Sequence, residues 1–188
     1  ANREAEKMLP SRNLYQPGSG KLMMVPSQEA QVGLFYLSQT PAGRARLNKI
    51  IGKSLITETI SKKSTHDMLH KLSKELGSNE YGRVLTELKA EGEKHAFDIG
   101  FTLGLDDLSV MRGNRDKITK HVAGMANTSE ANRVGIAMLD KILEKRFKGK
   151  GNPLFDMVES GARGERGQVR QMLATPLFVT DASGKIVP

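Results

Sequence analysis

Apolar residues recur at helical intervals over much of this chain, so helices are the main elements that its sequence predicts. Residues 1–9 are expected to form a short first helix. Ser27 suits the N-cap of a second helix that runs to about Ser38, with an apolar face formed by Ala30, Leu34 and Leu37. A third helix is predicted to begin at Ser64, which resembles a capping box with Asp67, and to stop at Gly77; its pattern continues into a further helix at Tyr81, Val84, Leu85 and Leu88.

The second half of the chain is predicted to contain basic helices, a break in the helical pattern and a hairpin. Two helices rich in Lys and Arg are predicted near residues 115–125 and 129–147, and their short connection favours an antiparallel pair. Residues 149–153 contain two glycines and a proline and are expected to break the helical pattern. Short extended pieces are predicted at residues 22–25 and in a hairpin that turns at residues 181–184. The predicted fold class is therefore mainly α with a few short β-strands or hairpins.

Composition sets limits on the function. Only 38% of the residues are hydrophobic and 5% are aromatic, which favours a slice of a larger assembly over a domain with its own large core. The absence of cysteine excludes disulfides, cysteine-based zinc sites and thiol catalysis. No apolar run approaches the ~18 residues of a membrane span, and the first residues resemble no signal peptide. We therefore expect a cytoplasmic protein without membrane contact.

The chain carries a formal net charge of +8, which suits a polyanionic partner. Much of this charge lies in residues 115–150, where nine Lys and Arg residues face four Asp and Glu residues. Aromatic residues do not alternate with these cations, so a stacking platform for single-stranded nucleic acid is not predicted. By default such helices present a solvated face, and a docking role is the alternative.

The segment from Val158 to Met172 combines glycines with arginines. Gly161, Gly164 and Gly167 are spaced three apart, and glycine allows positive φ and close approach of the backbone to another group. Three arginines accompany them (Arg163, Arg166 and Arg170), and each guanidinium can bind phosphate oxygens through two N–H groups. The pattern predicts either a phosphate-facing loop or a flexible basic loop, because short glycine motifs have high false-positive rates.

Other candidate sites are weaker. Gly18-Ser19-Gly20-Lys21 lacks the earlier glycine and the final Ser or Thr of a P-loop. His66 and His70 have the spacing of metal ligands on a helix, but no third ligand is evident, so a packed or solvated pair is favoured. Asp106 and Asp107 are interpreted as a turn-starting pair in preference to a Mg²⁺ site. No nucleophile and base can be paired, so we expect no catalytic residue and no metal ligand in this chain.

Four segments, in the same order along the chain, resemble the largest catalytic subunit (β′) of multisubunit DNA-directed RNA polymerases. They are residues 22–36, with Val-Pro-Ser-Gln and Gly-Leu-Phe-Tyr; residues 40–48, with Thr-Pro-Ala-Gly-Arg; residues 96–108; and Ser160–Gly164, the Ser-Gly-Ala-Arg-Gly that opens the F-loop of that family. The resemblance covers nearly the whole chain. It implies a segment that runs from just after the metal-binding loop to just before the bridge helix.

This resemblance implies a division of the chain by role. Residues 1–63 would support the active site, residues 64–110 would form the helical secondary-channel region, residues 111–150 would be a reduced pair of rim helices, and residues 151–188 would form the F-loop region. The Asn-Ala-Asp-Phe-Asp-Gly-Asp motif of the family is absent. The chain alone is thus expected to be inactive, with Mg²⁺ held by another segment or chain. Implied partners are the other polymerase subunits, the DNA template, RNA and nucleoside triphosphates.

The resemblance also assigns residues. Arg163 would contact the triphosphate of the incoming nucleotide, and the structural residues of the F-loop would be Ser160, Gly161, Gly164, Gln168, Arg170 and Gln171. The stretch between Gly52 and Ser64 is far shorter than in cellular bacterial enzymes, which suggests the split polymerases of large bacteriophages, located in a host cytoplasm or virion. Two alternatives are a piece of a longer subunit and, from another class, a free-standing basic helical adaptor that binds nucleic acid without catalysis.

Overall fold

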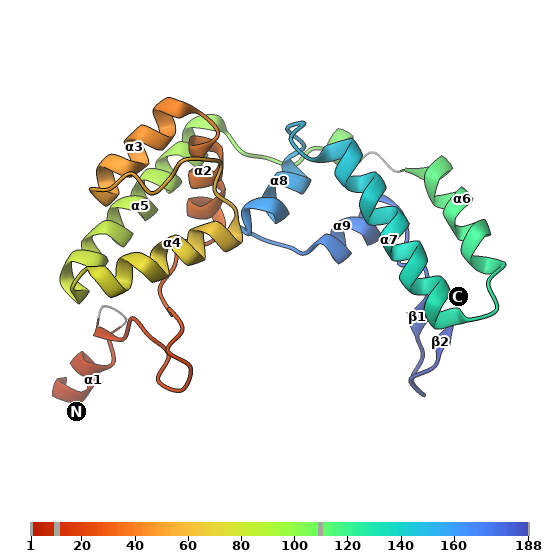
Figure 1. Cartoon of the computed structure of the whole chain (residues 1–188), viewed down its shortest axis with the longest axis horizontal. Coiled ribbons are helices and arrows are strands. Elements are labelled where there is room, and N and C mark those ends of the chain that lie inside the picture. Colours follow the sequence, from red (N-terminus) through yellow and green to blue (C-terminus); the bar gives the residue numbers. More distant parts are fainter. Residues whose placement is uncertain (1, 10–11, 109–110, 188) are drawn as a thin grey trace. The chain divides into compact units, whose positions relative to one another are not determined.

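The computed structural model describes residues 2–9, 12–108 and 111–187, and it is mainly helical, as predicted (Figure 1). The chain forms two compact units. The first unit comprises the residues up to Phe101 together with Glu159–Ala162, and the second unit comprises Thr102–Val158 and the residues from Arg163 onwards. The chain therefore leaves the first unit, returns to it briefly and leaves it again.

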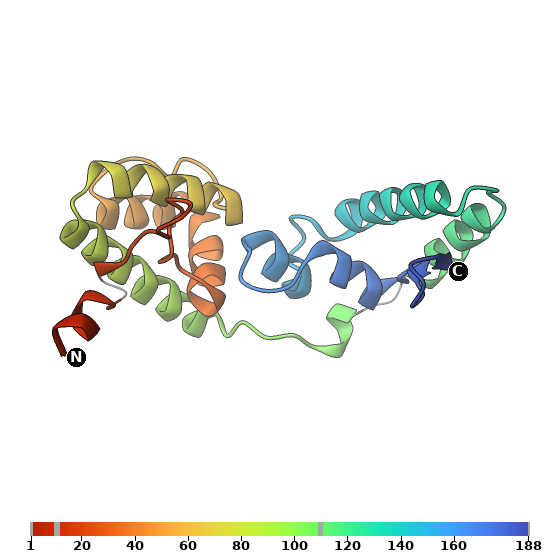
Figure 2. The same ribbon diagram turned by 90° about the horizontal axis from the view of Figure 1, so that it is seen from below.

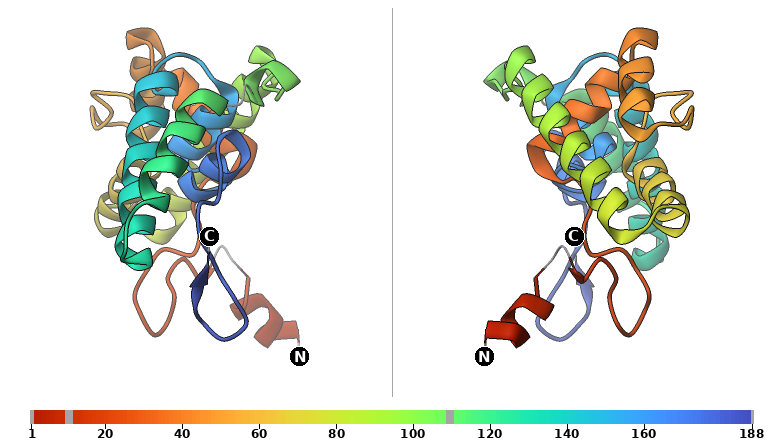
Figure 3. Two further views of the ribbon diagram at one scale, coloured as in Figure 1. Left: turned by 90° about the vertical axis from the view of Figure 1, so that its right-hand side faces the viewer. Right: turned by 90° about the vertical axis from the view of Figure 1, so that its left-hand side faces the viewer.

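The first unit is built on a close crossing of α2 (Gln28–Ser38) and α5 (Ser78–Ile99), which Figure 3 shows in its right-hand view. Gly33 on α2 and Gly92 on α5 allow the two backbones to approach, because a Cβ on Gly33 would lie 1.8 Å from the carbonyl oxygen of Gly92. The short helix α1 (Asn2–Lys7), α3 (Pro41–Ile51) and α4 (Lys62–Glu75) complete this unit's helices in the described residues. Its core is aliphatic, with the fully buried Tyr81 among Leu34, Leu47, Leu69, Leu72 and Leu88.

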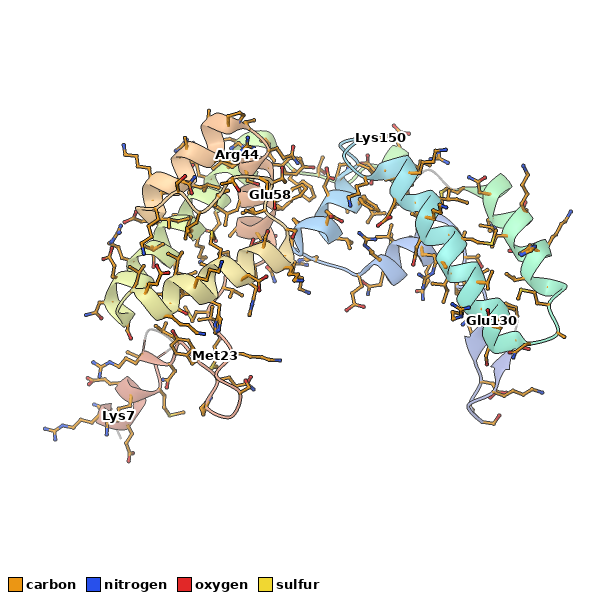
Figure 4. All side chains as sticks on the ribbon, viewed as in Figure 1. Lys7, Met23, Arg44, Glu58, Glu130 and Lys150 are labelled. Carbon is orange, nitrogen blue, oxygen red and sulfur yellow. The ribbon has the colours of Figure 1, made fainter. Side chains whose placement is uncertain are left out.

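The Thr-Pro-Ala-Gly-Arg segment connects α2 to α3. The Thr40 Oγ1 accepts a hydrogen bond of 3.0 Å from the Gly43 N–H, and Pro41 occupies the first turn, where a missing N–H costs nothing. Arg44, labelled in Figure 4, donates from Nη1 to the carbonyl of Ser38 at 2.8 Å and so satisfies the C-terminal end of α2. This segment is thus a helix connection held by its own side chains.

One predicted boundary and one predicted strand in the first unit are wrong. Helix α4 begins at Lys62, because Ser61 is the N-cap and forms the capping box with Ser64, whose Oγ accepts from the Ser61 N–H at 2.7 Å. The predicted stop at Gly77 is confirmed, since α4 ends at Glu75 with Leu76 as its C-cap; Gly77 also serves as the N-cap of α5 and has a φ of −66°. The predicted strand at residues 22–25 is reduced to one antiparallel bridge between Leu22 and Tyr15, because the described chain offers no longer partner strand.

In the second unit, α6 (Arg112–Ala123) and α7 (Thr128–Phe147) form the predicted antiparallel pair, which Figures 1 and 2 both show side by side. The Oδ1 of Asn127 caps α7 by accepting from the Glu130 N–H at 3.1 Å. Beside this pair lie the 3-10 helix η2 (Leu105–Leu108), α8 (Pro153–Ser160), of which the last two residues belong to the first unit, and α9 (Arg166–Leu173). The predicted hairpin is present as β1 (Val179–Thr180) and β2 (Ile186–Val187), paired antiparallel.

Candidate functional site

The glycine loop, defined here as Gly161–Glu165, connects α8 to α9. Gly161 has φ 79° and Gly164 has φ 76°, so both adopt the left-handed conformation that the sequence predicts. Gly167 does not, because it lies within the first turn of α9. The loop therefore bends at two glycines, on either side of Ala162 and Arg163.

The start of the loop is closely packed inside the first unit. A Cβ on Gly161 would lie 2.3 Å from the Cβ of Lys62, so this position requires glycine for space as well as for its φ. Ser160 is fully buried, and its Oγ accepts from the Ala162 N–H at 3.3 Å. The carbonyl of Ser160 accepts a hydrogen bond of 2.8 Å from Nε2 of Gln31 on α2. Both predicted residues thus hold the bend in place.

The end of the loop is held by a helix cap, which lies in the second unit. Glu165 and Gln168 form a capping box at the start of α9, in which the Gln168 Oε1 accepts from the Glu165 N–H at 2.9 Å. A Cβ on Gly164 would lie 3.3 Å from Cγ2 of Val158, so glycine also relieves crowding here. Gln168 therefore acts as a helix cap.

The three arginines of the segment differ in their surroundings. Arg170 has a side chain only 12% exposed and pairs with Asp140 on α7, with Nη1 to Oδ1 at 3.0 Å. Arg166 pairs with Glu144, also on α7, and lies over the Phe155 ring with its Cζ 5.9 Å from the ring centroid. The hydrogen bond from Arg166 holds the pKa of the Glu144 carboxyl below its ordinary value. These two arginines fasten α9 to α7.

Arg163 is exposed, and within the described parts of the chain its guanidinium forms no ion pair or hydrogen bond. Its backbone is nevertheless fixed, since its N–H donates to the carbonyl of Met157 at 3.3 Å. The arrangement leaves one permanently charged, planar side chain on an anchored bend, which is suited to an anion with paired oxygens. Gln171 is exposed as well and borders a shallow groove of about 400 Å³ together with Met172.

Several of these contacts were not predicted. The complementary spacing was present in the sequence, because Asp140 and Glu144 lie four apart on α7 and Arg166 and Arg170 lie four apart on α9. Gln31 gave no comparable signal, since nothing in a helical pattern shows which distant group a buried amide will contact.

The four carboxylates of residues 115–150 each pair with an arginine: Asp116 with Arg115, Glu130 with Arg133, Asp140 with Arg170 and Glu144 with Arg166. Among the exposed lysines are Lys141 and Lys145 on α7 and Lys150 in the turn that follows it, where Figure 4 labels Lys150. The paired acids leave Lys141 and Lys145, which lie four residues apart, as outward charges on one face of α7. They form a face of positive charge for which the described residues provide no ion pair.

The remaining candidates have structural surroundings. The Asp107 Oδ2 accepts at 2.8 Å from the N–H of Gly104, the residue just before η2, which is the backward-reaching bond of a capping box. The rings of His66 and His70 stack with centroids 6.3 Å apart. Over residues 2–9, 12–108 and 111–187, no three His, Cys, Asp or Glu side chains come together as metal ligands would. No helix in those same ranges has both the length and the apolar character required to cross a membrane.

Comparison with known proteins finds β′ subunits of DNA-directed RNA polymerase among the similar sequences. No family model matches the chain. It is 23% identical to the DNA-directed RNA polymerase subunit β′ of Aquifex pyrophilus over 257 residues, which covers 96% of this chain. Similarity to a β′ segment extends over nearly the whole chain. The chain is also 25% identical to the β′ subunit of Treponema pallidum over 96% of its length and 28% identical to that of Chlorobaculum tepidum over 79%.

This β′-like chain spans only 16%, 18% and 12% of the lengths of these three relatives. The aligned stretch of 257 residues in the Aquifex pyrophilus protein is longer than the 188 residues of the chain itself. The β′-like chain is therefore shorter than the segment to which it is similar.

Proposed function

We propose that this chain is a segment of the β′-like subunit of a multisubunit DNA-directed RNA polymerase, from just after the metal-binding loop to just before the bridge helix. The observation that carries the proposal is the similarity to β′ subunits over 96% of the chain. Within it, residues 1–63 support the active site, residues 64–110 form the secondary-channel region, residues 111–150 form the rim and residues 151–188 form the F-loop region. The shortness of the chain relative to the aligned β′ segment favours a split polymerase of the bacteriophage kind.

In the assembled enzyme, nucleotidyl transfer joins a nucleoside triphosphate to the 3′ end of RNA. Mg²⁺, held by carboxylates of another segment or chain, would stabilise the negative charge on the reacting oxygens. The part that we assign to this chain is to hold the triphosphate and to support the bridge helix and trigger loop. Gln168, Arg170 and Gln171 on α9 are assigned to that support.

We assign phosphate binding to Arg163. It is the arginine of the segment that α7 does not engage, and it stands on a bend fixed by Gly161 and Gly164. A guanidinium can donate two parallel hydrogen bonds to phosphate oxygens, and it keeps its charge at every physiological pH. Charge that accumulates on the departing pyrophosphate would be stabilised by a donor already in position.

The test is single-nucleotide addition by the assembled polymerase over a range of triphosphate concentrations. Loss of one preorganised donor typically lowers a rate by about 10²–10³, and loss of a ground-state contact also raises KM. We expect Arg163→Ala to slow addition most at low triphosphate, and Arg163→Lys to restore only part of the rate, because the ammonium lacks the planar fork. Arg3→Ala, which removes the same charge from the exposed α1, is the matched control.

Wild-type rate and KM for Arg163→Ala in a fully assembled enzyme would refute the phosphate role and leave the glycine loop as a structural bend. The adaptor alternative makes a separate prediction, namely that the free chain binds nucleic acid without sequence preference and with strong salt dependence. Purification of the chain from its native source distinguishes the two, since the polymerase proposal requires the other subunits to co-purify.

A further inference from the structure

We propose that Gln31 is a positioning residue that fixes the start of the glycine loop and thereby the place from which Arg163 extends; its effect on catalysis rests on the proposed function above. Gln31 lies on α2, far from the loop in sequence, and is 3% exposed. Hydrogen bonds offset the cost of burying an amide, and among the described residues the Gln31 Nε2 makes two of them while its Oε1 makes none. Its two hydrogen-bond partners show which segments Gln31 connects.

Both bonds of the Gln31 amide nitrogen join other elements to α2. Nε2 donates to the Thr65 Oγ1 on α4 at 3.0 Å and to the Ser160 carbonyl at 2.8 Å. Ser160 is the last residue of α8, where carbonyl groups accept from donors outside the regular helical pattern, and the Gln31 side chain is such a donor. Turning the amide over would place Oε1 against the Ser160 carbonyl, two acceptors facing each other, and this fixes the orientation.

The residue that follows is held from another side. Gly161 packs against the side chain of Lys62 at the start of α4, with no room for a Cβ between them. The loop start is therefore clamped between a hydrogen bond from α2 and a steric contact with α4. Arg163 follows two residues later, so an error in the placement of Ser160 is passed along the chain to it.

Two substitutions separate positioning from general stability. Gln31→Met keeps the length of the side chain but removes both donors, so it removes the hydrogen bond from Gln31 to the Ser160 carbonyl. Thr65→Val keeps the shape of Thr65 and removes only the acceptor on α4, so the bond to Ser160 remains. Both leave one polar group fewer in the same buried place, which makes Thr65→Val the matched control. Gln31→Asn, one methylene shorter, takes the place of Gln31→Met if the latter chain does not fold.

The structural measurement is hydrogen exchange of the full chain, followed in the peptide that covers residues 158–166 and compared with peptides from α5. Loss of one buried hydrogen bond should speed exchange in this peptide roughly three- to tenfold in Gln31→Met, with exchange in Thr65→Val close to wild type. Equal acceleration in the two variants, or acceleration in α5 of the same size as in the loop, would overturn the positioning role. This readout does not depend on polymerase activity.

The functional measurement is the same nucleotide-addition assay in the assembled enzyme. We expect Gln31→Met to raise KM for the triphosphate severalfold, and to add nothing further in an Arg163→Ala background, because the two residues act on one contact. Additive effects in the double variant would overturn this inference while leaving the proposed function standing. If Arg163→Ala has no effect, the proposed function is refuted instead. The hydrogen-exchange result then decides alone whether Gln31 fixes the start of the glycine loop.

Discussion

Replacement of Gly92 by alanine tests the tightest contact in the first unit. A Cβ at this position would lie 2.2 Å from the carbonyl oxygen of Ala30 and 3.0 Å from Cγ of Leu34. Ordinary contacts with a Cβ begin near 3.4 Å, so the backbones of α2 and α5 would have to separate by about 1 Å. The atom that obstructs is backbone, and it cannot turn away as a side chain would.

The magnitude follows from two opposed terms. Overpacking a buried contact typically costs about 1–3 kcal/mol, and the backbone obstruction puts Gly92→Ala at the upper end. Alanine also gains about 1 kcal/mol over glycine inside a helix. We therefore expect the free energy of unfolding to fall by about 2 kcal/mol. Gly82 on the same helix is the control, because a Cβ there meets no atom within 4 Å, and Gly82→Ala should raise it by up to ~1 kcal/mol.

The assay is urea unfolding of the full chain, followed by tyrosine fluorescence. The chain has no tryptophan, and its three tyrosines (Tyr15, Tyr36 and Tyr81) all lie in the first unit, so the signal reports that unit alone. A midpoint that shifts upward in Gly92→Ala as it does in Gly82→Ala would show that α2 and α5 do not cross at this distance.

Three further predictions concern the whole chain and its surfaces. The isolated chain should incorporate no nucleotide and should melt at low temperature, and efficient incorporation by the pure chain would refute the assignment. Charge reversal at Lys141, Lys145 and Arg146 should leave the DNA affinity of the assembled enzyme and its salt dependence unchanged; a slope reduced by about 0.9 per removed contact would instead favour the adaptor. Burial raises the pKa of the Tyr81 phenol to about 12, with a smaller contribution from Tyr15. Because the unfolded phenol ionises at about 10, the free energy of unfolding should fall as the pH rises from about 10 towards 12. Tyr81→Phe should remove that pH-dependent fall, although it gives up the hydrogen bond to the Met24 carbonyl. An absorbance titration should show one phenol fewer ionising at the high-pH end in this variant.

The helices were predictable because their signals are local. Caps and apolar spacing within a few residues gave α2, α5 and the antiparallel pair of α6 and α7. The strand predicted at residues 22–25 failed for the opposite reason, since a strand needs a partner from elsewhere and only Tyr15 opposes Leu22. The displaced start of α4 came from a choice between two serines, Ser61 and Ser64, that both belong to the same capping box.

In the candidate site, the bend of the glycine loop was predictable from the sequence, but the contacts that hold the loop in place were not. Positive φ at Gly161 and Gly164 follows from the residue type, whereas Gly167 was misjudged because the capping box of Glu165 and Gln168 starts α9 before it. The role of Lys62 could not be found in the sequence, because it depends on which surface the loop meets. Long-range polar contacts of this kind follow from the assembled fold.

The return of Glu159–Ala162 to the first unit has a consequence for the order in which the chain folds during synthesis. Translation at about 5–20 residues per second needs roughly 3–12 s to pass from Phe101 to Ala162. Throughout that interval Ser160 has not yet been added to the chain, so one N–H of the Gln31 amide lacks the acceptor that it has in the complete first unit. A ribosome-bound chain stalled before residue 159 should thus hold an incomplete first unit, and a gene divided within residues 102–158 would have to restore this closure by association of its two products.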